Sequence, residues 1–144
     1  MAVTANPHST SEPAAAAYAV SKGAFWTGWI LTGLVVLFLL FDAFGKFAKP
    51  VQVTDAFVKL GIPISQSVTI GALLLLCTIL YAIPRTAVLG AVILTGYLGG
   101  AVAIQMRVGN SVFETTFPVL FAAIAWLGIY LRDRALRRIL PIRM

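Results

Sequence analysis

Four long stretches without a charged residue constrain this 144-residue chain more than any other feature. They contain 19, 25, 21 and 17 residues, and they lie between Lys22 and Asp42, Lys59 and Arg85, Arg85 and Arg107, and Glu114 and Arg132. A membrane-spanning helix needs about 17–25 mainly apolar residues, and a charge at its centre costs about 2.5–3.5 kcal/mol. The stretches therefore predict four transmembrane helices. We place these helices near residues 24–44, 65–83, 87–106 and 116–132.

The composition excludes the other broad classes of fold. Apolar residues make up 60% of the chain and charged residues 11%, whereas an average soluble domain has about 45–50% and about 25%. A soluble domain of this length has too much surface to cover with so few charges, and disorder requires the opposite composition. We predict an all-α fold, an integral membrane four-helix bundle that forms one domain over residues 22–141. Residues 1–21, rich in Ala, Ser, Thr and Pro, are predicted to be a flexible cytoplasmic tail.

A cleaved signal peptide is the alternative for the first apolar stretch. A signal core has about 7–15 apolar residues, and this stretch is longer. Its leader also carries Lys22 as the only basic residue. The other three stretches predict a membrane protein in either case, so we favour a retained first helix.

The distribution of Lys and Arg predicts the orientation of the helices. Four spans place both termini on one side of the membrane, and cytoplasmic loops carry an excess of Lys and Arg. The side with the termini has seven such residues, Lys22, Arg85, Arg132, Arg134, Arg137, Arg138 and Arg143. The other side has four, Lys46, Lys49, Lys59 and Arg107. We therefore expect both termini to be cytoplasmic in a multi-pass protein of the cell inner (plasma) membrane.

The net charge of +6 comes mostly from the end of the chain, where five basic residues lie in the last 13. An anionic leaflet attracts such a segment by about 1 kcal/mol per charge. Apolar residues alternate with these arginines at helical spacing, which predicts a continuation of the last helix along the interface, ended by Pro141. The basic cluster thus indicates the lipid bilayer as a partner and not a nucleic acid.

The connections between the spans carry signals of their own. Residues 46–64 form the longest connection and contain a predicted short interfacial helix, with Thr54 as its N-cap and Gly61 as its C-cap. Pro84 begins a tight turn between the second and third spans. Pro118 suits the first turn of the fourth span.

Small residues at intervals of four predict how the helices pack. Membrane helices associate through residues that allow close approach. Gly28 and Thr32 form such a pair in the first span, and Gly96 and Gly100 in the third. We expect the first and third spans to pack on each other within one chain. The alternative is a homo-oligomer formed through the face of Gly96 and Gly100.

The residue inventory excludes several kinds of chemistry. The only His is His8, in the predicted tail, and the only Cys is Cys77, in the second span. Haem ligation by His within the spans, thiol–disulfide exchange within the chain and a clustered metal site all lack their ligands. A Ser-His-Asp triad and a phosphate-binding loop are also absent from the sequence. We therefore expect no cofactor held by this chain, and the residues favour a role that is not enzymatic.

Polar residues near the predicted external ends of the spans are the remaining candidates for a site. The charged ones are Asp42, Lys46, Arg107 and Glu114. Asp42 and Lys46 share a helix face at spacing i,i+4, so a plain interfacial ion pair is the alternative to a functional site. Packing of the first span on the third would bring Arg107 to Asp42. Tyr97 and Gln105, on the third span, are candidates to line a cavity that leads to this cluster, and packing on a neighbouring helix is the alternative for Gln105.

Several segments resemble the DoxX-like family of small membrane proteins. They are residues 26–34 (WTGWILTGL), 41–46 (FDAFGK), 80–91 (LYAIPRTAVLGA), 94–101 (LTGYLGGA) and 126–133 (WLGIYLRD). The resemblance covers roughly residues 25–141. It implies a four-helix bundle, in agreement with the charge-free stretches, and it transfers no catalytic residue.

The resemblance leaves two classes of function open. Some members of the family are subunits associated with redox enzymes, and distant animal relatives resemble chaperones for the assembly of ligand-gated channels. This chain is thus expected to be a non-catalytic membrane subunit or assembly partner of another membrane protein. The alternative is a quinone- or lipid-interacting component of a redox complex whose cofactors lie on a partner. A transporter ranks third, because the spans contain no ionisable residue that marks a substrate path.

Overall fold

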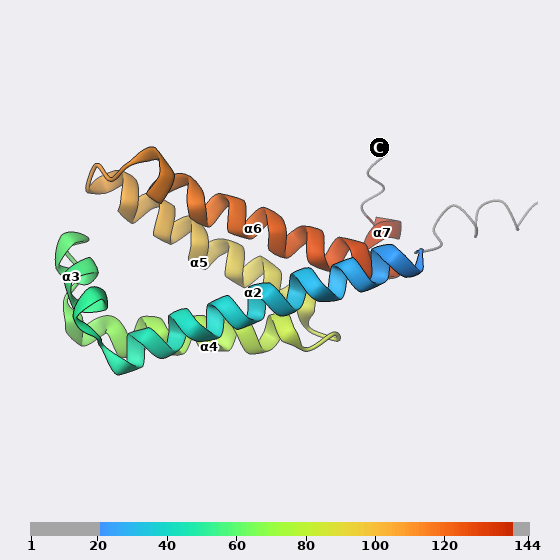
Figure 1. Ribbon diagram of the computed structural model, residues 1–144, viewed down its shortest axis with the longest axis horizontal. Helices are drawn as coiled ribbons and strands as arrows, with labels where there is room; N and C mark the ends of the chain where they lie inside the picture. The colour runs from blue at the N-terminus through green and yellow to red at the C-terminus, as the bar shows by residue number, and fades with distance from the viewer. Residues whose placement is uncertain (1–20, 140–144) are drawn as a thin grey trace, which may run out of the picture.

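The computed structural model describes residues 21–139, and all regular elements among them are helices. The helices, labelled as in Figure 1, are α2 (Lys22–Ala48), α3 (Val51–Lys59), the 3₁₀ turn η1 (Ile64–Gln66), α4 (Ser67–Ala82), α5 (Ala87–Arg107), α6 (Val112–Arg132) and α7 (Arg134–Ile139). Four of these segments are long and apolar enough to cross a membrane. The predicted all-α membrane bundle with four spans is confirmed. The tail predicted over residues 1–21 lies outside the described residues, except for Ser21.

Local capping explains where the first and last spans begin. The Ser21 side chain accepts a hydrogen bond from the backbone nitrogen of Ala24 at 3.2 Å, so α2 begins at Lys22. Ser111 and Glu114 form a capping box, in which each side chain binds the other residue's backbone N–H, so α6 begins at Val112. Pro118 consequently lies inside α6, and its predicted place in the first turn is wrong.

Helix α3 also begins earlier than its sequence suggests. Its N-cap is Pro50, and the Thr54 hydroxyl, one turn inside the helix, donates to the carbonyl oxygen of Pro50 at 3.4 Å. The predicted N-cap role of Thr54 is therefore wrong. The helix ends at Lys59, and Gly61, at φ +66°, takes the left-handed conformation that turns the chain towards α4.

The four long helices form a ring in which α2 packs on α4 and α6, and α5 packs on the same two helices. The expected packing of the first span on the third is wrong, because α2 and α5 lie diagonally across this ring. Gly28 instead contacts α6, where a Cβ atom at this position would lie 2.8 Å from the Gly128 carbonyl oxygen. Thr32 is buried at the same interface, and its hydroxyl donates to the Gly28 carbonyl at 2.8 Å. Gly128, which was not among the small residues used to predict packing, is thus the residue of α6 that Gly28 approaches.

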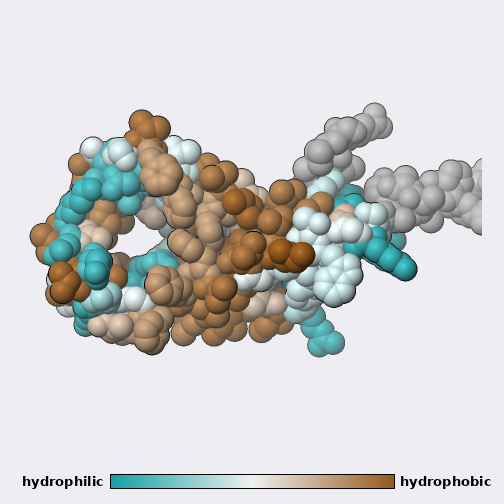
Figure 2. Space-filling model, in the orientation of Figure 1, coloured by the Kyte–Doolittle hydropathy of each residue, from teal (hydrophilic) through white to brown (hydrophobic). Residues whose placement is uncertain are grey.

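The two ends of the bundle differ in width. Figure 1 shows the pair α2 and α4 diverging from the pair α5 and α6 towards α3. We call this wide end the α3 end, and the opposite end, with the start of α2, the α4–α5 turn and α7, the terminal end. Apolar side chains cover the middle of the face shown in Figure 2, and hydrophilic residues lie towards both ends, as expected for helices that cross a bilayer.

Candidate functional site

A cavity of about 810 Å³ lies between the diverging helices at the α3 end, and all four spans and α3 line it. We call it the α3-end cavity. Figure 2 shows the opening between the hydrophilic α3 region and the apolar middle of the bundle. Ligand sites of proteins typically measure about 300–1,000 Å³, so the volume suits a small organic molecule or part of a lipid.

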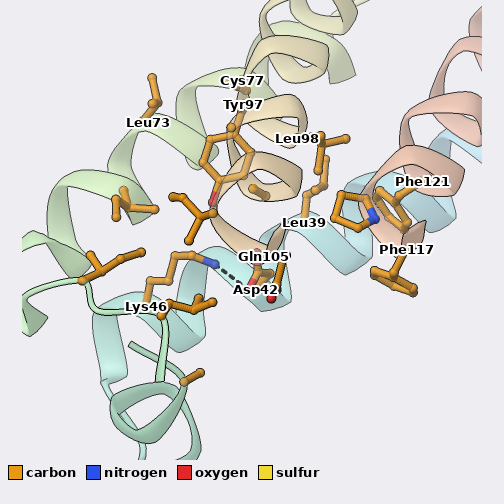
Figure 3. Close-up of a pocket in the computed structure, with 18 of the residues that line it drawn as sticks. Leu39, Asp42, Lys46, Leu73, Cys77, Tyr97, Leu98, Gln105, Phe117 and Phe121 are labelled. Atoms are coloured by element: carbon orange, nitrogen blue, oxygen red, sulfur yellow. Dashed lines mark ion pairs between the residues drawn. The ribbon is translucent and has the colours of Figure 1, made fainter. Parts of the chain in front are cut away.

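Most of the cavity wall is apolar. Leu73 and Cys77 of α4 line it, and Leu39 of α2 lies beside Leu98 of α5 in Figure 3. Phe38 lies against Phe121 across the gap between α2 and α6, with ring centroids 4.7 Å apart. Aromatic contacts continue along α6 through Phe117 to Phe113. Residues 113, 117 and 121 thus form an aromatic ladder at helical spacing, of which Phe117 and Phe121 line the cavity. The i,i+4 pattern of this ladder is a signal that the sequence analysis missed.

An ion pair forms the charged part of the lining. Lys46 Nζ lies 2.6 Å from Asp42 Oδ1, and the Lys46 side chain is only 12% exposed whereas that of Asp42 is 42% exposed. Both residues line the cavity (Figure 3). The backbone beneath Lys46 is fixed by α4, since the Ser67 hydroxyl donates to the Lys46 carbonyl oxygen at 2.5 Å. A Cβ atom at Gly71 would lie 3.0 Å from Lys46 Cβ, so this glycine lets the two helices approach.

Two neutral polar side chains of α5 join this ion pair. Tyr97 and Gln105 both line the cavity, and in Figure 3 the Tyr97 hydroxyl points towards the Lys46–Asp42 pair while Gln105 lies beside Asp42. The Gln105 side-chain carbonyl accepts a hydrogen bond from the Asn110 side chain, which holds the amide in place. The cavity thus presents a hydroxyl, an ammonium, an amide and a carboxylate within apolar walls.

The structure divides the predicted external cluster in two. Arg107 Nη2 donates to the Leu60 carbonyl oxygen at 2.7 Å, and Glu114 Oε1 lies 3.1 Å from Lys59 Nζ. These residues attach α5 and α6 to the end of α3. Of the two partners predicted for Asp42, Lys46 pairs with it and Arg107 does not. The physical reason is the position of α3, whose C-terminal end lies against the α5–α6 end and offers both a carbonyl oxygen and an ammonium group.

Gly96 and Gly100 have a different place from the one expected. A Cβ atom at either position would meet no atom within 4 Å, and both residues line the cavity. The prediction that they pack against the first span is therefore wrong. Because glycine has no side chain, these two positions leave volume in the cavity free. Sequence alone does not separate a glycine that closes an interface from one that keeps a volume open.

No group of three or more His, Cys, Asp or Glu side chains that could hold a metal ion occurs within residues 21–139. The donors of the cavity are suited to hydrogen bonding and charge pairing. What the arrangement offers chemically is an apolar volume with one polar region, which is the form of site that binds an amphipathic molecule.

Comparison with known families matches residues 30–128 to the DoxX-like family. The matched region extends from α2 into α6 and includes all of the polar cavity residues named above. Neither the curated proteins nor the solved structures gave a match.

Proposed function

This chain belongs to the DoxX-like family, and on that premise we propose that it is a non-catalytic, multi-pass protein of the cell inner membrane that binds a lipid-soluble amphiphile. The observation that carries the proposal is the α3-end cavity, which combines apolar walls with one polar region inside the membrane-spanning part of the fold. A water-soluble, polar substrate would fit this cavity poorly, because its polar groups would lose their hydrogen bonds to water against the apolar walls.

The polar residues favour a head group that accepts hydrogen bonds. Tyr97 supplies a hydroxyl and Lys46 an ammonium, and the Gln105 amide has its NH₂ group as a donor. A quinone ring carries carbonyl acceptors on an apolar ring, and the aromatic ladder of α6 offers faces on which such a ring stacks. Asp42 supplies an acceptor for the hydroxyl of the reduced, quinol form. We therefore propose the quinone class as ligand, with lipid head groups as the competing class.

A quinone ligand implies a second protein that exchanges electrons with it. A bound quinone exchanges electrons with a redox centre. We propose that a second membrane protein with its own redox cofactor supplies or accepts those electrons, as a subunit of one complex. Copurification in mild detergent followed by mass spectrometry tests this part. A partner without a redox cofactor would instead support the assembly-partner role.

The binding itself is tested by filling the cavity with one side chain. Gly100 and Gly99 are neighbours on α5, a Cβ atom at either meets nothing within 4 Å, and only Gly100 lines the cavity. Decylubiquinone is titrated into the detergent-solubilised protein, and the melting temperature and tryptophan fluorescence are followed. We expect Gly100→Leu to abolish the response and Gly99→Leu to leave it unchanged. Equal responses in both variants would refute binding in this cavity.

A further inference from the structure

Arg132, at the terminal end, is a buried charge without a counterion among the described residues. It is 9% exposed, and no carboxylate of residues 21–139 forms a salt bridge with it. Its Nη2 donates to the Tyr81 carbonyl oxygen at a long 3.4 Å, and its Nη1 is buried with no hydrogen-bond partner in this part of the chain. The guanidinium lies over the Trp29 ring, with Cζ 4.6 Å from the ring centroid.

The neighbouring acid, Asp133, forms no salt bridge with Arg132. Asp133 Oδ1 accepts hydrogen bonds from the backbone nitrogens of Ala135 and Leu136, at 2.8 and 3.2 Å, and so caps α7. The backbone of Arg132 is packed closely against α2, since a Cβ atom at Gly28 would lie only 2.9 Å from the Arg132 backbone nitrogen. A buried guanidinium with unused donors is unfavourable until an anion accepts from it.

A second cavity, of about 330 Å³, lies beside this residue, and we call it the terminal-end cavity. Its lining includes two arginines and one acid, Arg132, Arg134 and Asp133, together with Trp29 and with Ala87, the first residue of α5. The N-cap of α5, Thr86, makes no side-chain capping hydrogen bond, so the first N–H groups of this 21-residue helix have no side-chain cap, and Ala87 of this first turn lines the cavity. A helix N-terminus with a nearby guanidinium favours an oxyanion.

We propose that the terminal-end cavity binds the phosphate group of an acidic phospholipid. The cavity lies at the ends of the spans, where lipid head groups lie, and its walls include Phe25 and Ile129, which suit the apolar part of a lipid. The same end carries further basic residues, Lys22, Arg85, Arg137 and Arg138, with Asp133 as the acid beside them in the described residues. Free phosphate offers the same oxyanion, but it has no use for the apolar walls.

Native mass spectrometry of the full-length protein, released from detergent, tests the proposal. Dioleoylphosphatidylglycerol is the probe, with dioleoylphosphatidylcholine and sodium phosphate as separate arms. We expect one phosphatidylglycerol to be retained more strongly than phosphatidylcholine, and Arg132→Gln to lower its apparent affinity about tenfold or more. Arg138→Gln is the matched control, because Arg138 is exposed, lies at the same end and does not line the cavity.

Arg134→Gln provides a second variant in case Arg132→Gln does not fold. Arg134 is exposed and lines the cavity, so its loss is expected to weaken phosphatidylglycerol binding by about two- to fivefold in a folded protein. Wild-type affinity in both cavity variants, or an equal loss in Arg138→Gln, would overturn the proposal. Saturation by sodium phosphate with no preference for the lipid would overturn the lipid as the source of the anion.

Discussion

The glycines at the narrow end of the bundle and the glycines of α5 at its wide end serve opposite purposes. At the terminal end, Gly28 and Gly128 bring α2 and α6 together, and a Cβ atom at Gly90 would overlap the Tyr81 backbone of α4. At the α3 end, Gly96 and Gly100 line a cavity, and a Cβ atom at either position would meet no atom within 4 Å. Glycine in a membrane helix thus either permits a backbone contact or keeps a volume free, and only the facing helix decides which.

The ends also differ in how their charges are arranged. At the α3 end, Lys46 pairs with Asp42 and Lys59 with Glu114. At the terminal end Arg132 is buried with no paired acid in the described part of the chain. Two of the basic residues at the wide end therefore have an acidic partner within the protein. The charge of Arg132 at the narrow end has no such partner within residues 21–139, which is why we propose an anionic ligand there.

The largest expected effect concerns which side of the membrane each end of the bundle faces. The bias of Lys and Arg predicts that the terminal end faces the cytoplasm and the α3 end faces outward. A fluorescent reporter fused to the C-terminus should be active in the cytoplasm, and alkaline phosphatase inserted at Asn110, in the α5–α6 connection, should be active outside. A C-terminal fusion that reports an external location would reverse the assignment of both ends.

A pair of substitutions on α5 tests the two roles of glycine. Gly90→Ala places a methyl group into the Tyr81 backbone, and we expect it to lower the free energy of unfolding by about 1–3 kcal/mol or more. Gly96→Ala meets open space, so the gain in helix propensity should raise the same quantity by about 0.5–1 kcal/mol. Thermal unfolding in one detergent measures both. Equal destabilisation by the two substitutions would remove the distinction between closed and open glycines.

The sequence predicts the number and approximate position of the spans because the free-energy cost of placing a charge in the bilayer is large compared with local helix preferences. The sequence predicts the ends of the helices less well, because local capping residues, and not the apolar stretch alone, set where a helix begins. The Ser111–Glu114 capping box was readable as S-x-x-E, and it moves the start of α6 four residues ahead of the predicted one. Thr54 was misread because a hydroxyl that binds the preceding turn of a helix resembles a cap in sequence.

The site was predictable only in part, for a physical reason. Tyr97 and Gln105 are conspicuous as polar residues in an apolar helix, and the structure places both at the cavity. The pairing of helices was not predictable, because small residues at intervals of four occur on α2 and on α5, and the partner of Gly28 is Gly128, a hundred residues away. The position of α3 depends on Lys59 and Glu114, 55 residues apart, and no local pattern records such a contact.

A comparison of the two ion pairs at the α3 end is expected to give a smaller effect. Lys46 is far less exposed than Lys59, so the Asp42–Lys46 pair should show a coupling energy of about 1 kcal/mol in a double-mutant cycle of Asp42→Asn and Lys46→Met. The coupling of Lys59 with Glu114 should be weaker and should disappear at high salt, where exposed charges are screened. Measured effects of Asp42→Asn and Arg107→Gln should simply add, because these residues do not touch. Strong coupling of Asp42 with Arg107 would contradict the division of the cluster.

The smallest expected effect concerns the attachment of α3 over the cavity. Arg107 donates to the Leu60 carbonyl at the end of α3, and a hydrogen bond of this kind contributes about 0.5–1.5 kcal/mol. Arg107→Gln should therefore speed hydrogen exchange of the α3 amides by about two- to tenfold, with the amides in the centre of α4 unchanged. Arg85→Gln, at the α4–α5 turn of the terminal end, is the matched control and should leave α3 exchange unaltered. If α3 exchanges equally in all three proteins, the cover of the cavity is held by the apolar contacts of Phe57 and not by this hydrogen bond.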